Sequence, residues 1–338
     1  MPSGAERDQR GAALAADPGG RAPDEHRAAA PGQLSRAAWG TVLRRTGRHL
    51  GSTHLPLLSA GIAFFAVLSI APVLVTALSV YGAVHTPQEA LAQLSGIAGV
   101  LPDALDRVVA DQLTTITTAS TNVLTRRGLT GLVVALWTAT TAATCLLDAL
   151  TLAYHETETR SWWQRTRLAL CFVLGGALLL GGLLAGAGVV SGVVDDAPTT
   201  LSGPLGLLWW PALALVMTGV LAVLYRYGPD RSPARYRWIS WGAAAATGLW
   251  LLTSGGLFAY VQRLGTYETT YGSLAGVAIS MFWLWITVLL VVAGAALNAE
   301  TERQTVLDST VGPPQPLGER GAVVADSAPP YPEDEPQA

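Results

Sequence analysis

The chain has 338 residues, of which 50% are hydrophobic and 13% are charged; its net charge is −3 and its mean hydropathy is +0.37. Soluble domains carry about 25% charged residues, so this composition excludes an ordinary soluble domain and indicates a polytopic membrane protein. The small net charge gives no reason to expect a nucleic acid as a partner. The two cysteines, Cys145 and Cys171, each lie in an apolar run, which argues against a disulfide framework.

The two ends of the chain have compositions typical of disorder. Residues 1–32 are rich in Ala, Gly, Pro, Arg and Asp, and residues 301–338 are rich in Pro and acidic residues, so we expect both tails to be disordered. Between them, residues 33–50 place Leu34, Ala38 and Val42 at helical spacing, with arginines on the other side. This pattern predicts an amphipathic helix in the membrane interface; a short solvated helix is the alternative.

Residues 33–300 contain six apolar runs that are long enough for helices that cross the bilayer, for which about 20 residues are needed. The predicted crossings are 56–81, 129–154, 168–194, 205–227, 238–263 and 273–298. The fold class is therefore all-α, a membrane domain of six transmembrane helices. The long polar connection 82–128 has the pattern of two short helices, and we expect them to cap the bundle on the extracytoplasmic side. In the third crossing, Gly182 and Gly186 form a small-xxx-small pair that lets another helix approach, within the chain or in a homo-oligomer.

Arginine counts predict the orientation. The approach to the first crossing and the loops after the second and fourth crossings are rich in arginine, whereas the other connections are long or poor in charge. The positive-inside rule therefore puts both termini in the cytoplasm, and the chain in the cytoplasmic (inner) membrane. An even number of crossings agrees with this result.

The densest polar group in the apolar part of the sequence precedes the sixth crossing. The segment 266–276 reads TYETTYGSLAG, and its polar and small residues are candidates to bind a head group or to gate a pathway. These candidates are Glu268, Thr270, Tyr271, Gly272 and Ser273. The alternative is a structural role, in which hydroxyls cap the helix and Gly272-xxx-Gly276 allows close packing.

Five further candidates, Asp148, Ser69, Pro72, Tyr225 and Arg226, lie in or beside the crossings. Asp148 is a carboxylate inside the second crossing, where a charge is costly unless it faces the bundle or a wet cavity; pairing with Arg160 or Arg226 is the structural alternative. Pro72 lies in mid-crossing and leaves the carbonyl of Leu68 without its usual partner, which Ser69 could replace. Tyr225 and Arg226 begin a basic collar that would attract anionic head groups.

The sequence offers no pattern for catalysis. The five histidines are scattered without metal-ligand spacing, and neither a Walker sequence nor G-x-S-x-G occurs. We therefore expect no metal site, no cofactor and no enzyme activity.

Several segments resemble the YihY/BrkB family of membrane proteins, whose members are often mislabelled ribonuclease BN. The similarity covers residues 34–300, and it is carried by residues 59–69 with Pro72, by 136–139, 158–160, 270–274 and 283–285, and by 294–298. The family usually has Glu where Ala296 stands here. The resemblance implies a six-helix inner-membrane protein connected with the cell envelope.

Two functions follow as hypotheses. The first is transport or positioning of a lipid or another amphipathic envelope substrate, in a polar cavity between the helices. The second is a scaffold that organises envelope assembly without transporting anything. Membrane lipids are the expected partners, with a homo-oligomer left open, and ribonuclease activity is disfavoured.

Overall fold

The computed structural model describes residues 28–52, 54–84, 121–196, 199–263 and 273–327. Over these ranges the chain is helical, apart from connections and one isolated bridge between Ala234 and Thr310. The helices are η2 (Pro31–Gln33), α2 (Arg36–Ser52), α3 (Leu55–Val84), α6 (Thr121–Ala153), α7 (Trp162–Asp196), α8 (Thr199–Tyr227), α9 (Tyr236–Arg263) and α11 (Ser273–Glu302). The expected all-helical class is confirmed for this part of the chain.

Five of the described helices are long and apolar enough to cross a membrane. These spans are Leu55–Val73, Gly128–Ala153, Trp162–Leu183, Tyr236–Val261 and Gly276–Glu302. They correspond to the first, second, third, fifth and sixth predicted crossings. The fourth falls in α8, where the apolar stretch found is the shorter Pro211–Tyr227. The first, second, third, fifth and sixth crossings therefore have a matching helix, and the fourth crossing stays a prediction.

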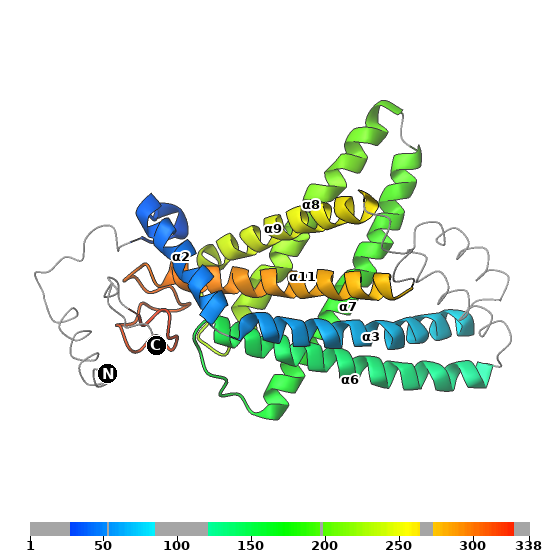
Figure 1. Ribbon diagram of the computed structural model, residues 1–338, viewed down its shortest axis with the longest axis horizontal. Coiled ribbons are helices and arrows are strands. Elements are labelled where there is room, and N and C mark those ends of the chain that lie inside the picture. The colour runs from blue at the N-terminus through cyan, green and yellow to red at the C-terminus, as the bar shows by residue number, and fades with distance from the viewer. Residues whose placement is uncertain (1–27, 53, 85–120, 197–198, 264–272, 328–338) are drawn as a thin grey trace, which may run out of the picture.

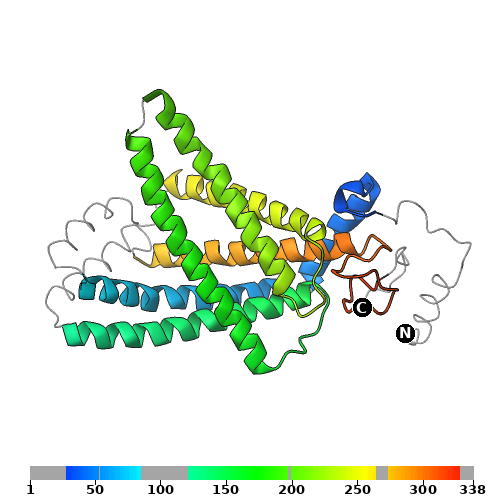
Figure 2. The same ribbon diagram turned by 180° about the vertical axis from the view of Figure 1, so that it is seen from behind.

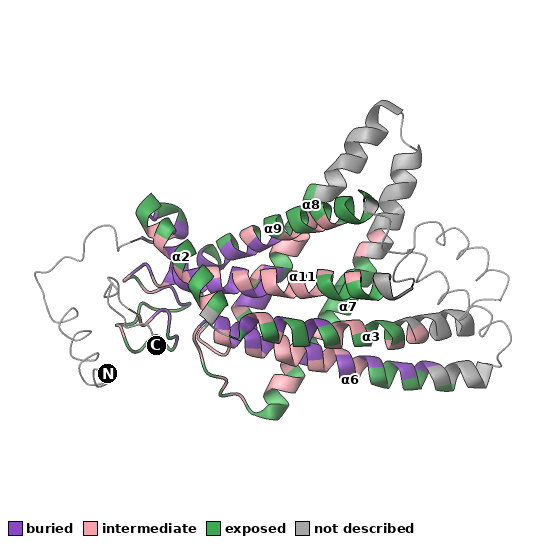
Figure 3. Cartoon of the chain, viewed as in Figure 1, coloured by how far each residue is buried: buried purple, intermediate pink, exposed green. Residues whose placement is uncertain are grey.

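The helices are arranged as a bundle with one compact end. The antiparallel helices α3 and α6 pack along each other, α11 lies against α3, and α9 and then α8 follow (Figure 1). Helix α2 and residues 303–327 lie at the same end of this bundle, which we call the terminal end; the opposite end is the far end. Buried residues concentrate toward the terminal end, whereas exposed ones dominate α7 and the far half of α9 (Figure 3).

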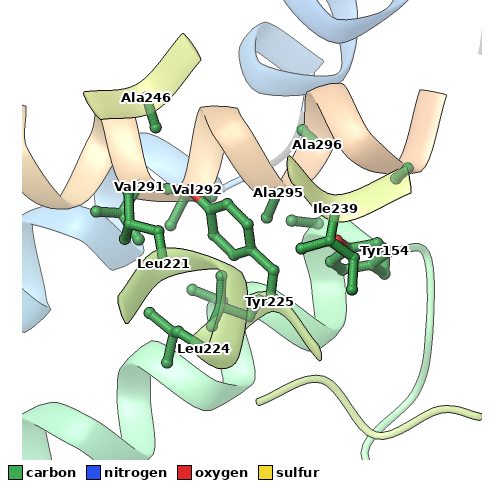
Figure 4. Packing of buried hydrophobic residues seen from close by; sticks show 14 of the residues in the cluster. Tyr154, Leu221, Leu224, Tyr225, Ile239, Ala246, Val291, Val292, Ala295 and Ala296 are labelled. Atoms are coloured by element: carbon green, nitrogen blue, oxygen red, sulfur yellow. The ribbon is translucent and has the colours of Figure 1, made fainter. Parts of the chain in front are cut away.

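Helices α9 and α11 approach each other most closely where glycine faces glycine. A Cβ added to Gly242 would overlap the carbonyl oxygen of Gly294 and the side chain of Asn298. Instead, the Gly242 N–H donates to Asn298 Oδ1 at 2.8 Å. The hydroxyl of Tyr225 from α8 enters the same contact and donates to the Val291 carbonyl at 2.7 Å, so three helices meet here (Figure 4).

The predicted glycine pair of α7 has a different environment. Among the described residues, nothing lies within 4 Å of a Cβ added at Gly182 or Gly186, so this part of the structure shows no close approach to either glycine. The glycines that do permit a close approach of α9 and α11 are Gly242 and Gly294, because these two helices lie side by side.

Pro72 does not interrupt α3, which continues from Leu55 to Val84. The Ser69 hydroxyl donates to the Ala66 carbonyl at 2.7 Å, so the expectation that Ser69 replaces the bond lost at Leu68 is wrong. One turn beyond the proline, the Thr76 hydroxyl donates to the Pro72 carbonyl at 2.8 Å. A Cβ added at Gly131 of α6 would lie 2.8 Å from that Thr76 oxygen, so α6 passes close to α3 beside the proline.

The predicted helix at residues 33–50 corresponds to α2. Val42 is fully buried and Leu43 is 60% exposed, so the apolar positions of this helix are divided between the bundle and the outside. Trp39 contacts Trp241 of α9, with ring centroids 5.6 Å apart. The placement of α2 in the membrane interface remains a prediction.

The C-terminal tail differs from the expected disorder, because residues 303–327 fold as a non-helical segment on the terminal end. The buried guanidinium of Arg320 organises it by donating to the carbonyls of Gln315, Val306 and Ala325 at 3.1, 2.9 and 2.7 Å. Composition could not indicate this fold, because it depends on which carbonyls the one buried arginine reaches, two of them five residues away and one fourteen residues away.

This segment also contacts two of the connecting loops. The Val323 N–H donates to Glu156 Oε1 at 2.7 Å, and the Ser232 N–H donates to the Gly321 carbonyl at 2.9 Å. The loops after α6 and α8 are thereby joined to the C-terminal segment (seen from behind in Figure 2). The predicted cap helices, most of the N-terminal tail and the last residues of the chain lie outside the described residues.

The glycine contact gives a stability prediction. Gly242→Ala should lower the free energy of unfolding by about 1–3 kcal/mol, because the new methyl group forces α9 away from α11. Gly248→Ala is the matched control in the same helix, since nothing lies within 4 Å of its added Cβ. Thermal unfolding of the detergent-solubilised protein measures the difference, and equal melting temperatures for the two variants would contradict this packing.

Candidate functional site

Asp148 of α6 forms an ion pair with Arg165 of α7, not with Arg160 or Arg226 as the sequence analysis supposed. The Arg165 guanidinium lies 3.0 Å from Asp148 Oδ1, and the two side chains are 27% and 36% exposed. The pair joins the terminal-end half of α6 to the start of α7. Because it is partly exposed and incompletely hydrogen-bonded, with the Arg165 Nε buried and unpartnered among the described residues, it can accept a further polar group.

Arg160 belongs to a separate network that connects the loops. It donates twice to Glu158 at 2.7 Å and to the Gly228 carbonyl at 2.9 Å. Asp230 lies 3.6 Å from Arg160 and accepts both the N–H and the hydroxyl of Thr159. Burial alone would raise the pKa of Asp230, but the Thr159 hydrogen bonds and the Arg160 charge lower it overall. This network ties the loop after α6 to the loop after α8.

The most buried ion pair joins Arg231 to Glu302. Their side chains are 2% and 1% exposed, and the guanidinium makes two bonds to the carboxylate, at 2.9 and 2.7 Å. Ser309 donates to the same carboxylate, and the guanidinium lies 5.0 Å above the Tyr154 ring. Glu302 therefore holds the end of α11, the loop after α8 and the C-terminal segment together.

Tyr225 and Arg226 point to different environments. Tyr225 is part of the buried cluster shown in Figure 4, and its hydroxyl donates to the Val291 carbonyl inside the protein. Arg226 stacks its guanidinium on Tyr236, at 4.1 Å from the ring centroid, and lies 5.4 Å from that of Tyr227. Of the two, only Arg226 is placed to meet an external anion.

The polar residues before the sixth crossing are only partly described. Glu268, Thr270, Tyr271 and Gly272 lie outside the described residues, and Ser273 begins α11. Their proposed role therefore stays a prediction. Ser69 and Pro72 are not joined to Asp148: the Ser69 hydroxyl and the Pro72 carbonyl each form a hydrogen bond within α3.

A group of titratable residues at the terminal end was not predicted from the sequence. The ring centroids of His49 and His155 are 4.1 Å apart, and His155 Nε2 lies 3.1 Å from Glu300 Oε1. These residues are separated by more than a hundred positions in the chain. No local spacing could have indicated the group, and only Glu300 carried a signal, as a charge at the end of an apolar run.

Within the described part of the chain, no three His, Cys, Asp or Glu residues are arranged to hold a metal ion. The ion pairs instead join helix ends and loops. A bundle of long apolar helices held together in this way at one end defines the chain as a polytopic helical membrane protein.

The chain belongs to the virulence factor BrkB family, whose model matches residues 46–317. This confirms the resemblance found in the sequence. The matched range extends from α2 through every predicted crossing and ends inside the C-terminal segment.

Similar proteins include a UPF0761 membrane protein of Verminephrobacter eiseniae, 26% identical over 271 residues that cover 79% of this chain and 64% of the relative. YfkH of Bacillus subtilis, described as ribonuclease-like, is 27% identical over 175 residues, 50% of this chain and 63% of its own. The UPF0761 membrane protein RSc1559 of Ralstonia nicotianae is 26% identical over 75% of this chain and 56% of its own. The chain thus spans less than two thirds of each of these relatives. No solved structure matches it.

The buried ion pair gives a second stability prediction. Arg231→Met should lower the free energy of unfolding by about 3–5 kcal/mol, because it leaves the Glu302 carboxylate buried without its cation. The double variant Arg231→Met with Glu302→Met should recover most of the loss. Arg237→Met, at an exposed position nearby, is the control for removing a positive charge. Thermal unfolding in detergent checks this order, and additive losses in the double variant would contradict it.

His49 gives a prediction for pH. Burial, followed by the neighbouring His155, lowers the pKa of His49 from 6.5 to about 4. The unfolded chain therefore binds a proton at His49 below pH 6.5, whereas the folded chain does so only near pH 4. The contribution of neutral, buried His49 to the free energy of unfolding is complete above pH 6.5. It is lost as the pH falls from 6.5 to about 4.

Melting temperatures measured across that window test the sign. The wild type should lose stability on acidification more steeply than His49→Leu. The matched control His54→Leu, which changes an exposed histidine, should follow the wild type. If the melting temperatures of His49→Leu and the wild type fall equally with pH, folding does not lower the pKa of His49 and the prediction is wrong.

Proposed function

We propose that this protein moves or positions a lipid, or another amphipathic molecule of the cell envelope, in the cytoplasmic membrane. The exposure of α7 carries the proposal. Every residue from Leu174 to Gly182 is exposed, a stretch of more than two helical turns that covers all faces of the helix. In a bilayer such a stretch is surrounded by acyl chains, including the side that faces the rest of the bundle.

The chemistry of this stretch supports an apolar ligand. It reads LGGALLLGG, and a Cβ added at any of Gly175, Gly176, Gly181 and Gly182 meets nothing within 4 Å. Helix α7 packs near its start, where Phe172 lies against the core, and then tilts away from α3 and α6 (Figures 1 and 2). The exposed apolar surface of this stretch suits a lipid that approaches from the side of the bundle.

The Asp148–Arg165 pair is the proposed contact for the head group. The pair joins α6 to α7 about two turns before the exposed stretch 174–182 begins. Trp162 and Trp163 at the start of α7 are 60% and 70% exposed, which is typical of residues at the level of the head groups. A zwitterionic head group can replace each half of the ion pair with a charge of its own, so that the exchange leaves no charge without a partner.

The proposal includes three further parts from the sequence. Arg226 and the exposed arginines of α2 put the terminal end on the cytoplasmic side and attract anionic lipids there. Glu268, Thr270, Tyr271 and Ser273 are proposed to bind the head group as well. Pro72 would let α3 bend as the lipid passes, because its ring removes a backbone hydrogen bond.

A reconstituted assay tests the function. Purified protein in liposomes should speed the transfer of a fluorescent phospholipid between leaflets relative to protein-free liposomes. Asp148→Asn and Arg165→Gln should each slow this transfer about tenfold, the effect of roughly 1.4 kcal/mol on a rate. Glu319→Gln, an exposed carboxylate in the C-terminal segment, is the control and should transfer lipid like the wild type.

The same variants distinguish transport from the scaffold role. If the wild type moves no lipid, and if Asp148→Asn restores a knockout strain fully, transport through this site is wrong. Deleting residues 328–338, which leaves the folded C-terminal segment intact, then tests the scaffold, which predicts loss of rescue. If instead Gly182→Cys forms efficient disulfides between copies, a second copy covers α7. The proposal that lipid surrounds residues 174–182 is then wrong.

A further inference from the structure

One face of α6 carries a row of polar side chains that ends at Asp148. Thr141, Thr144 and Asp148 are three and four residues apart, so the helical repeat places them on the same side of the helix. The row covers about 10 Å of the helix axis. All three residues are partly exposed, whereas Thr138 and Ala149, on the side that packs into the bundle, are 1% and 0% exposed. The row therefore lies on a side of α6 that a lipid can reach.

The two threonine hydroxyls of this row can accept hydrogen bonds but have no proton left to donate. The Thr141 hydroxyl donates to the Trp137 carbonyl at 2.8 Å, and the Thr144 hydroxyl donates to the Thr140 carbonyl at 2.7 Å. A hydroxyl has one proton and two acceptor lone pairs, so each oxygen can still receive a donor from outside the helix. An ionised carboxylate also only accepts. We therefore call Thr141, Thr144 and Asp148 the acceptor row.

Arg165 of α7 supplies the opposite chemistry at the end of the acceptor row. Its guanidinium lies 3.0 Å from Asp148 Oδ1, and its Nε is buried without a hydrogen-bond partner among the described residues. A guanidinium offers N–H donors and no acceptor, in a geometry that matches a phosphate group. A phosphate bound at Arg165 therefore places the rest of a phospholipid head group beside Asp148 and the two threonines.

A threonine hydroxyl that bonds its own helix is by itself no sign of a ligand. Thr253 of α9 is exposed, and its hydroxyl donates to the carbonyls of Leu249 and Trp250. Such a bond satisfies the hydroxyl proton in lipid and needs no further partner. The acceptor row differs because its two hydroxyls lie one turn apart and in line with an ion pair that has an unused donor.

We infer that α6 selects a phospholipid whose head group carries a primary ammonium. The phosphate binds Arg165, and the ammonium donates to Asp148 and, farther along the acceptor row, to Thr144 and Thr141. A primary ammonium has three N–H donors. A trimethylammonium group has the same charge but no N–H, so it can meet the carboxylate but cannot bond the hydroxyls. The inference rests on the proposed function, because it assigns the specificity of that same site.

The liposome assay tests this specificity with phospholipids labelled on an acyl chain, so that the head group stays intact. Phosphatidylethanolamine and its mono-, di- and trimethylated forms, the last being phosphatidylcholine, keep their positive charge and lose one N–H donor at each methylation. Transfer by the wild type should slow along this series, by about tenfold between its two ends, the effect of losing one hydrogen bond to a charged group.

Variants of the acceptor row test which residues read the ammonium. Thr141→Val with Thr144→Val keeps the shape of both side chains and removes the acceptors. This variant should transfer phosphatidylethanolamine as slowly as phosphatidylcholine, whereas Thr141→Ser with Thr144→Ser should retain the preference. Thr253→Val is the matched control, since it removes an exposed hydroxyl of the same kind from α9, and it should behave like the wild type.

Two results would overturn the inference and leave the proposed function standing: equal wild-type rates for all four lipids, or a preference that survives in the double valine variant. If no lipid moves at all, the proposed function is wrong and lipid retention decides the inference. Protein purified from an equal mixture of phosphatidylethanolamine and phosphatidylcholine is then analysed by mass spectrometry. The wild type, but not the double valine variant, should retain an excess of phosphatidylethanolamine, and equal retention by the two proteins contradicts the acceptor row.

Discussion

The ion pair between Arg231 and Glu302 is the interaction on which the terminal end depends. Both side chains are almost completely buried, and two hydrogen bonds join them. A buried pair adds little net stability over apolar residues, but removing one partner is costly, so it fixes the arrangement more than it strengthens it. Because Glu302 also receives Ser309, this one carboxylate sets the position of the end of α11, the loop after α8 and the C-terminal segment.

Helices α7 and α9 can separate from their neighbours toward the far end because contacts at the terminal end hold the helices together. At the terminal end, Gly242 and Gly294 let α9 and α11 touch, and Tyr225 closes the contact from α8. Toward the far end α7 leaves its neighbours and α9 becomes largely exposed. Apolar helices have no hydrophobic driving force for contact with one another over contact with lipid, so away from close-packed small residues a bilayer tolerates such divergence where water would not. The division into a fixed end and an open end is the basis of the proposed lipid pathway.

The polar groups inside the bundle are distributed in the same way. The Asp148–Arg165 pair, the Arg160 network and the Glu300 group all lie where helices or loops are joined. Asp148 and Glu300 lie in helices, where a charge without a partner is costly in a bilayer, and each pairs with a residue of another element. Arg160 pairs with Glu158 of its own loop and also bonds the loop after α8. These pairs connect the helix ends, and the Asp148–Arg165 pair is also the contact proposed for a head group.

The sequence by itself determined the helical class, the positions of five crossings and the family, because apolar length and motif order are local properties of the chain. It also indicated Asp148 as a charge that needs a partner. Only the tertiary structure decided that this partner is Arg165, that residues 303–327 fold, and that His49, His155 and Glu300 meet. Those contacts join residues far apart in the chain, and hydropathy and spacing carry no information on which helix ends lie together.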